Sequence, residues 1–110
     1  EAQFYQAFFS KPAHQRLSKI ITKGADGLDL ILPDGACQSF SAFEVPSLSS
    51  HGAGDVFVGA LAAQRLAQIP WESALRYAQA AAALHVATPR RQRAAITPGD
   101  IKALLHKGAR

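Results

Sequence analysis

SSHGAGDVF, at residues 49–57, joins a loop to a long apolar segment. Glycines at positions 52 and 54 let the backbone turn tightly and come close to a ligand. If a helix begins here, its first amides have no partner within the helix, and the helix dipole adds partial positive charge. Such a helix end suits a phosphoryl group. The stretch therefore predicts an anion site with the carboxylate of Asp55 on the adjoining first turn.

Asp55 has two interpretations at this position. A carboxylate beside a bound phosphoryl group can take a proton from an attacking hydroxyl, while the amides of Ala53, Gly54 and Asp55 form an anion hole. In the other interpretation, Asp55 is an ordinary first-turn acid that stabilises a helix, and the glycines serve a tight turn. Short Gly-Asp combinations are common, so the spacing alone leaves both interpretations open.

Three helices are predicted in the second half of the chain. Residues 54–68 are apolar on most sides and free of proline, which predicts a buried helix. Residues 71–87 predict a second helix with one apolar face. That face consists of Leu75, Ala78, Ala82 and Val86, with Glu72, Arg76 and Gln79 off it. Residues 97–100 (TPGD) predict a third helix that starts with a capping box and runs to about Lys107.

Short strands are predicted in the first half. Residues 19–22 (KIIT) form a β-branched run that predicts a buried strand. Alternating leucines at residues 28–32, the turn Pro33-Asp34-Gly35 and a second run at residues 36–40 predict a hairpin. A further extended segment is expected at Ala42 to Val45.

A short helix at residues 2–9 completes the predicted order: helix, strand, hairpin, strand and three helices. This order favours part of a layered α/β domain, because the strand at residues 19–22 would need parallel neighbours to cover it, and no segment of these 110 residues supplies them. At 110 residues the chain is one domain at most.

GAGDVFVGAL at residues 52–61 resembles the signature of the ribokinase-like (phosphofructokinase B) carbohydrate kinases, in which an Asp-Thr-x-Gly-Ala-Gly-Asp stretch leads into a helix. The resemblance makes Asp55 the base that activates the substrate hydroxyl, with Gly52, Ala53 and Gly54 beside it. The family's Thr-x-Gly-x-x-Gly run, which contacts the ATP phosphates and ribose, is matched by Thr22, Lys23, Gly24, Ala25, Asp26 and Gly27. A family asparagine near the adenine corresponds to Gln79, which lies 24 residues after Asp55.

The resemblance implies a fold and an activity. The fold is the C-terminal portion of a three-layer α/β/α domain, with residues 1–110 as its nucleotide-binding and catalytic part and the substrate-binding N-terminal half absent. The activity is ATP-dependent phosphorylation of a hydroxyl on a sugar or similar small molecule. ATP comes with Mg²⁺, held by phosphates and water more than by the chain. The alternative is a fragment that binds a nucleotide or sugar phosphate without turnover.

The chain departs from the family pattern at the start of the signature. The aspartate found there helps many members to bind an activating monovalent cation, but this chain has Ser49, whose neutral hydroxyl is a weaker ligand. Residues 89–95 (PRRQRAA) also lack a glycine that members often carry after the preceding helix. Dependence on a monovalent cation such as potassium therefore stays open.

Composition bears on partners and compartment. The net charge is +4, and residues 85–110 hold six basic residues against one acidic residue. No aromatic residues alternate with these arginines, so nucleic acid is not an expected partner. No apolar run has the length of a membrane span, the histidines lack metal-ligand spacing, and the lone Cys37 fits a reducing compartment. A cytoplasmic protein is expected, and a homodimer stays open.

Overall fold

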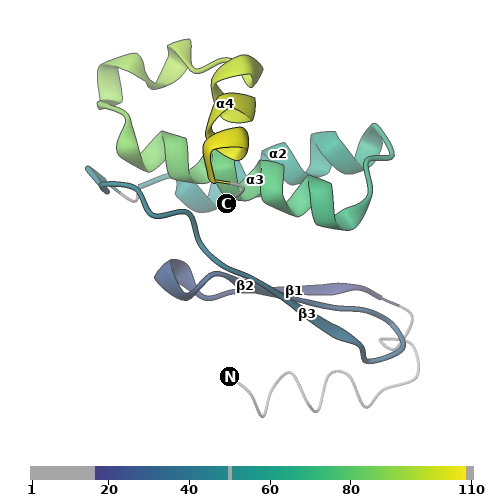
Figure 1. Cartoon of the computed structure of the whole chain (residues 1–110). Helices are drawn as coiled ribbons and strands as arrows, with labels where there is room; N and C mark the ends of the chain where they lie inside the picture. The colour runs from purple at the N-terminus through teal and green to yellow at the C-terminus, as the bar shows by residue number, and fades with distance from the viewer. Residues whose placement is uncertain (1–16, 50, 109–110) are drawn as a thin grey trace. The chain divides into compact units, whose positions relative to one another are not determined.

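The structure is a computed structural model that describes residues 17–49 and 51–108 (Figure 1). The chain divides into two compact units, with the boundary between Ala42 and Phe43. Each unit is described by itself below. The helix predicted at residues 2–9 lies outside the described residues.

The first unit contains a three-stranded antiparallel sheet in the order β1-β2-β3. Its strands are β1 (Lys19–Thr22), β2 (Leu28–Ile31) and β3 (Cys37–Phe40). Leu28 pairs with Phe40, and both are buried together with Leu30. Alternation along β2 places Leu28 and Leu30 on one face of the sheet, which makes that face the core of the unit.

The prediction of a buried β1 is wrong, because β1 is only half-buried. The parallel neighbours, expected outside this chain, stay a prediction. Within the chain β1 pairs antiparallel with β2, with Lys19 opposite Ile31 and Thr22 opposite Leu28. The reason for the antiparallel pairing is the short connection between the two strands, a single 3₁₀ turn, η2 (Gly24–Asp26). A connection this short reverses the chain, whereas a parallel pair needs a crossover of a dozen or more residues.

The predicted hairpin between β2 and β3 is confirmed. The amide of Leu32 donates to the carbonyl of Ala36 at 2.8 Å, and the amide of Gly35 donates to the carbonyl of Leu32 at 2.8 Å. The predicted extended segment at Ala42 to Val45, in contrast, forms no strand. Alternation of side chains does not make a strand where no neighbouring strand offers a hydrogen-bonding edge.

The second unit is built around its longest helix, α3 (Trp71–Ala87), which has the predicted bounds. α2 (Ala53–Leu66) and α4 (Pro98–Gly108) both pack against α3. The buried residues of α3 are Ala74, Leu75, Ala78, Gln79, Ala80 and Ala81. Small alanine side chains let the neighbouring helices approach closely, so α3 forms the core of this unit.

Two burial predictions for these helices are wrong. α2 was predicted to be buried, but none of its residues is, and Val58 and Leu66 are 64% and 85% exposed. Gln79 was predicted to lie off the apolar face of α3, but it is only 9% exposed. In both cases the helical period was identified, but burial also depends on which helices pack against each face. Among the described helices, α3 packs against both α2 and α4, whereas α2 packs mainly against α3.

The capping box predicted at the start of α4 is confirmed. The amide of Asp100 donates to Oγ1 of Thr97 at 3.2 Å, and the amide of Thr97 donates to Oδ2 of Asp100 at 2.9 Å. The segment before α4 forms a 3₁₀ helix, η3 (Arg90–Ala95). None of the helices in the described part of the chain is long and apolar enough to cross a bilayer.

Candidate active site

The residues predicted to form an anion site lie at the N-terminus of α2. Gly52 is the N-cap, with φ 83° and ψ −2° in the left-handed region. The hydrogen bond from the amide of Val56 to the carbonyl of Gly52, at 3.1 Å, starts the helical ladder. The amides of Ala53, Gly54 and Asp55 precede this bond, so helix geometry gives them no partner within the helix. Asp55 is exposed on the same first turn.

Two independent features favour glycine at position 52. Its positive φ disfavours a side chain, and a Cβ built there would lie 3.2 Å from Nε2 of His85. His85 comes from the last turns of α3, and its Nε2 lies 3.0 Å from the carbonyl oxygen of His51. Because a carbonyl oxygen can only accept, the ring nitrogen Nε2 must carry the hydrogen that is donated. We call the N-terminal end of α2, residues 52–55, the helix mouth. A histidine that lies far away in the sequence thus restricts the space beside it.

Two further contacts hold the segment before α2. The amide of Leu48 donates to the carbonyl of Val86 at 2.7 Å, and Nη2 of Arg93 donates to the carbonyl of Ser49 at 3.2 Å. The sequence did not identify His85 or Arg93 as part of this site. Only their position at the end of α3 and in the segment directly after it could have suggested them.

Gln79, the residue predicted to lie near an adenine, sits in the core of the second unit. Its Oε1 accepts a hydrogen bond from Nη1 of Arg76 at 2.7 Å. The Arg76 guanidinium lies 4.2 Å from the centre of the Phe43 ring, and burial lowers its pKa below the ordinary value. Gln79 is thus placed by α3 and oriented by Arg76, and its nucleotide contact stays a prediction.

The predicted phosphate loop, residues 22–27, lies in the first unit. Its own backbone uses several of its amides: Lys23 donates to the Gly27 carbonyl at 2.8 Å, Asp26 to Lys23 at 3.0 Å and Gly27 to Gly24 at 3.1 Å. Residues 22–26 are exposed. The loop is therefore a preformed turn, whose exposed backbone and Thr22 side chain are available to a ligand.

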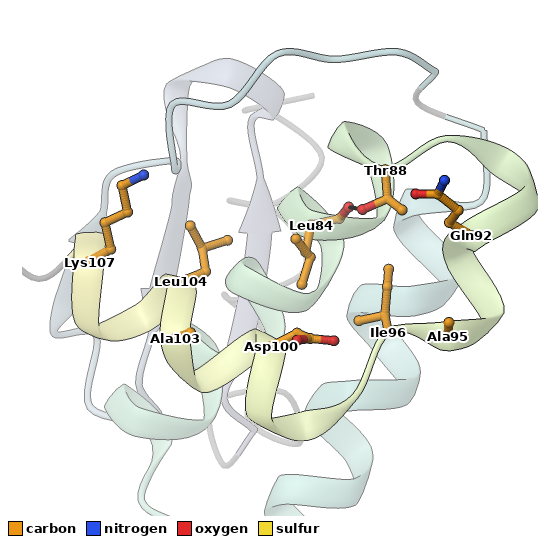
Figure 2. A pocket seen from close by; sticks show the side chains of 9 residues that line it. All are labelled: Leu84, Thr88, Gln92, Ala95, Ile96, Asp100, Ala103, Leu104 and Lys107. Atoms are coloured by element: carbon orange, nitrogen blue, oxygen red, sulfur yellow. Dashed lines mark hydrogen bonds between the residues drawn. The ribbon is translucent and has the colours of Figure 1, made fainter.

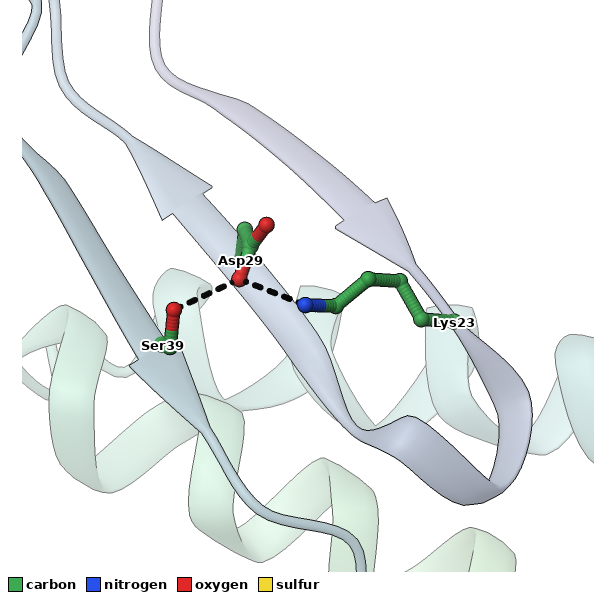
Figure 3. A network of polar contacts seen from close by, with 3 residues as sticks. All are labelled: Lys23, Asp29 and Ser39. Atoms are coloured by element: carbon green, nitrogen blue, oxygen red, sulfur yellow. Dashed lines mark hydrogen bonds and ion pairs between the residues drawn. The ribbon is translucent and has the colours of Figure 1, made fainter. Parts of the chain in front are cut away.

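Lys23 belongs to a polar network on the sheet (Figure 3). Its Nζ lies 3.0 Å from Oδ1 of Asp29, which also accepts a hydrogen bond from Oγ of Ser39 at 2.7 Å. The Ser39 hydrogen bond, and after it the Lys23 ammonium, hold the pKa of Asp29 below its ordinary value against an opposing effect of desolvation. A phosphate contact by Lys23 would have to compete with this ion pair.

Two cavities lie in the second unit. The larger, of about 640 Å³, is formed by the end of α3, η3 and α4, and Figure 2 shows Leu84, Ile96 and Leu104 around it. The smaller, of about 340 Å³, is lined by Val56, His85 and Arg93 among others. Neither is lined by Asp55 or Gln79. The smaller cavity therefore lies beside the hydrogen bonds that His85 and Arg93 make to the segment before α2.

Comparison with known proteins identifies a common family. The model of the pfkB family carbohydrate kinases matches residues 8–97. A curated relative, the 2-dehydro-3-deoxygalactonokinase of Haloferax volcanii, is 35% identical over 89 residues, which is 81% of this chain and 27% of the relative.

Solved structures agree with this match. Arabidopsis thaliana ribokinase, complexed with ribose and ATP, is 25% identical with a TM-score of 0.72, over 80% of this chain and 28% of its own. The aminoimidazole riboside kinase of Salmonella enterica, complexed with aminoimidazole riboside and an ATP analog, is 31% identical with a TM-score of 0.69, over 80% of this chain and 31% of its own. The chain therefore spans less than a third of each of these proteins.

Proposed function

Because the chain belongs to the pfkB family of carbohydrate kinases, we propose that it carries the catalytic portion of an enzyme that transfers the γ-phosphoryl group of ATP to a hydroxyl of a sugar or similar small molecule. The predicted fold class is confirmed: the chain has the α/β fold of the C-terminal portion of ribokinase-like kinases. Complexes of its structural neighbours with ribose, a riboside and ATP support both the donor and the acceptor class.

The observation that carries the proposal is the exposed carboxylate of Asp55 on the first turn of α2. This turn directly follows the N-cap Gly52, whose backbone lies in the left-handed region. In the proposed reaction Asp55 takes the proton of the acceptor hydroxyl, whose oxygen attacks the γ-phosphorus as the bond to the ADP oxygen breaks. The amides of Ala53, Gly54 and Asp55 stabilise the charge on the transferring phosphoryl group. Phosphoryl transfer needs mainly positioning and electrostatic stabilisation, which a helix N-terminus supplies.

The nucleotide contacts are proposed on both units. The turn at residues 22–27, of which residues 22–26 are exposed, would contact the phosphates and ribose. Gly54 would contact the phosphate, and Gln79 would lie near the adenine. Mg²⁺ would accompany ATP and neutralise phosphate charge. Among the described residues no group of three His, Cys, Asp or Glu side chains could hold a metal ion. The proposal has Mg²⁺ held mainly by phosphate oxygens and water, as it commonly is.

Asp55→Asn in the full-length protein tests this role. The amide keeps the shape of the side chain but cannot accept the proton, so we expect kcat to fall by about 10²- to 10⁴-fold with the Kd for ATP unchanged. Steady-state kinetics on a panel of sugars, sugar acids and nucleosides, with calorimetric titration of ATP, gives both quantities.

Glu72→Gln is the matched control, because Glu72 is the first-turn acid of α3. If Asp55 only stabilises its helix, both variants will lose a little stability and keep their activity. A kcat only a few-fold lower in Asp55→Asn would therefore remove Asp55 from the base role. Tight ATP binding by the unaltered protein, with no turnover on any acceptor, would favour the alternative of a non-catalytic binding protein.

A further inference from the structure

The guanidinium of Arg93 joins two backbone segments of the second unit. Its Nε donates to the carbonyl of Thr88 at 3.1 Å, and its Nη2 donates to the carbonyl of Ser49 at 3.2 Å. Thr88 is the C-cap of α3, and Figure 2 shows it at the end of that helix. Ser49 belongs to the segment that leads into α2. One half-buried side chain therefore fixes this segment to the end of α3.

The surroundings of this guanidinium are those of a cation site. Backbone carbonyl oxygens are the ligands that replace the hydration shell of ions such as K⁺. The C-terminal end of a helix adds partial negative charge, which favours a cation. An arginine side chain keeps its charge at every accessible pH and presents its donors in a rigid fork. Arg93 thus supplies a permanent positive charge to oxygens that would otherwise suit a bound ion.

The residues here do not fit the monovalent cation that the family resemblance implies. The position of the family's cation-binding aspartate is occupied by Ser49, which brings no negative charge. The carbonyl oxygen of Ser49 is already bonded to Arg93. A second positive ion beside this guanidinium would be repelled, because like charges at close range interact unfavourably.

We propose that Arg93 is a built-in cation that replaces a bound monovalent ion in holding the segment before α2. The inference rests on the proposed function, since its catalytic consequence is the placement of the helix mouth at Gly52. Arg93 would act through the backbone, as a positioning residue. His85 supports the same segment through the His51 carbonyl, so the two side chains together fix where the amides of α2 point.

The proposal is tested in the full-length protein with KCl, NaCl and choline chloride at equal ionic strength. We expect the kcat of the unaltered protein to be the same in all three salts. Arg93→Ala should lower kcat by about 10²-fold, the loss typical of a misplacement of about 1 Å. Added K⁺ or guanidinium ion should restore several-fold of that loss, whereas choline should not. Arg91→Ala, an exposed neighbour on η3, should match the unaltered protein in every salt.

A second measurement does not depend on turnover. The melting temperature of the unaltered protein should be the same in KCl and choline chloride, and that of Arg93→Ala should be higher in KCl. If the protein phosphorylates no acceptor, the proposed function fails, and the melting temperatures still decide the role of Arg93. If Arg93→Ala does not fold, Arg93→Gln, which removes the charge but keeps most of the side chain, takes its place in both measurements. Stimulation of the unaltered protein by K⁺, or a salt-independent defect in the variant, would overturn the proposal.

Discussion

Gly27 shows how a residue in a predicted ligand loop can also be required by the fold. Its φ is +90°, and a Cβ built there would lie 1.9 Å from the carbonyl oxygen of Phe40, which is backbone and cannot rotate away. Gly27 is therefore fixed by the approach of β3 to the turn before β2. The family resemblance of the loop implied only contacts to the ATP phosphates and ribose.

We expect Gly27→Ala to lower the free energy of unfolding by about 3 kcal/mol, since it adds overpacking to an unfavourable backbone angle. Gly35→Ala is the matched control: Gly35 has the same φ of +90° but open space around it, so the cost should be about 1 kcal/mol. Urea denaturation measures both. Equal stabilities for the two variants would show that the contact with Phe40 relaxes, and would leave ligand binding as the main reason for Gly27.

At the scale of the element, α4 depends on its first turn. Thr97 and Asp100 satisfy each other's backbone amides, and Asp100 also lies at the positive end of the helix dipole. We expect Thr97→Ala to lower the free energy of unfolding by about 1 kcal/mol. Because the two hydrogen bonds share one geometry, Thr97→Ala and Asp100→Ala together should cost less than the sum of the single variants.

A double-mutant cycle by chemical denaturation measures this coupling. Thr88→Ala is the control partner for Asp100→Ala in this cycle. The Thr88 hydroxyl donates to the carbonyl of Leu84 within the same unit and has no part in the capping box, so these two substitutions should be additive. Strict additivity between Thr97→Ala and Asp100→Ala would mean that each hydrogen bond forms without the other.

The elements that the sequence predicted well are those with local signals. Pro70 and Pro89 bound the second helix, TPGD starts the third, and Pro33-Asp34-Gly35 sets the hairpin, so the structure agrees closely with these predictions. The helix mouth at Gly52 was found in the same way, because its glycines and Asp55 are adjacent in the chain.

Most of the predictions that failed concern burial, which depends on partners distant in sequence. The half-buried state of β1 and the exposure of α2 are set by which segments pack together, and no local pattern records that. The same holds for the contacts behind the site. Arg93 and His85 reach Ser49 and His51 across the fold, so an arginine-rich segment was indistinguishable in the sequence from a solvated loop.

At the scale of the whole molecule, the chain divides into two compact units. The two largest fully buried side chains are Leu28, in the sheet, and Leu75, in α3, so each unit holds one of them. Compact units of a chain commonly open locally as separate cooperative units, which makes separate local opening of the sheet and of the helices the expectation.

We therefore expect Leu28→Ala and Leu75→Ala to affect different amides in hydrogen exchange on the full-length protein. Each should cost about 2–5 kcal/mol by leaving a cavity. Leu28→Ala should accelerate exchange in β2 and β3 and leave α3 protected, and Leu75→Ala should do the reverse, because each residue lies in a different compact unit. Equal loss of protection across both units in either variant would show a single cooperative unit. In that case one free energy of unfolding would apply to the turn at residues 22–27 and to the helix mouth at Gly52. A substitution in the sheet would then disturb the placement of Asp55 as much as one in α3.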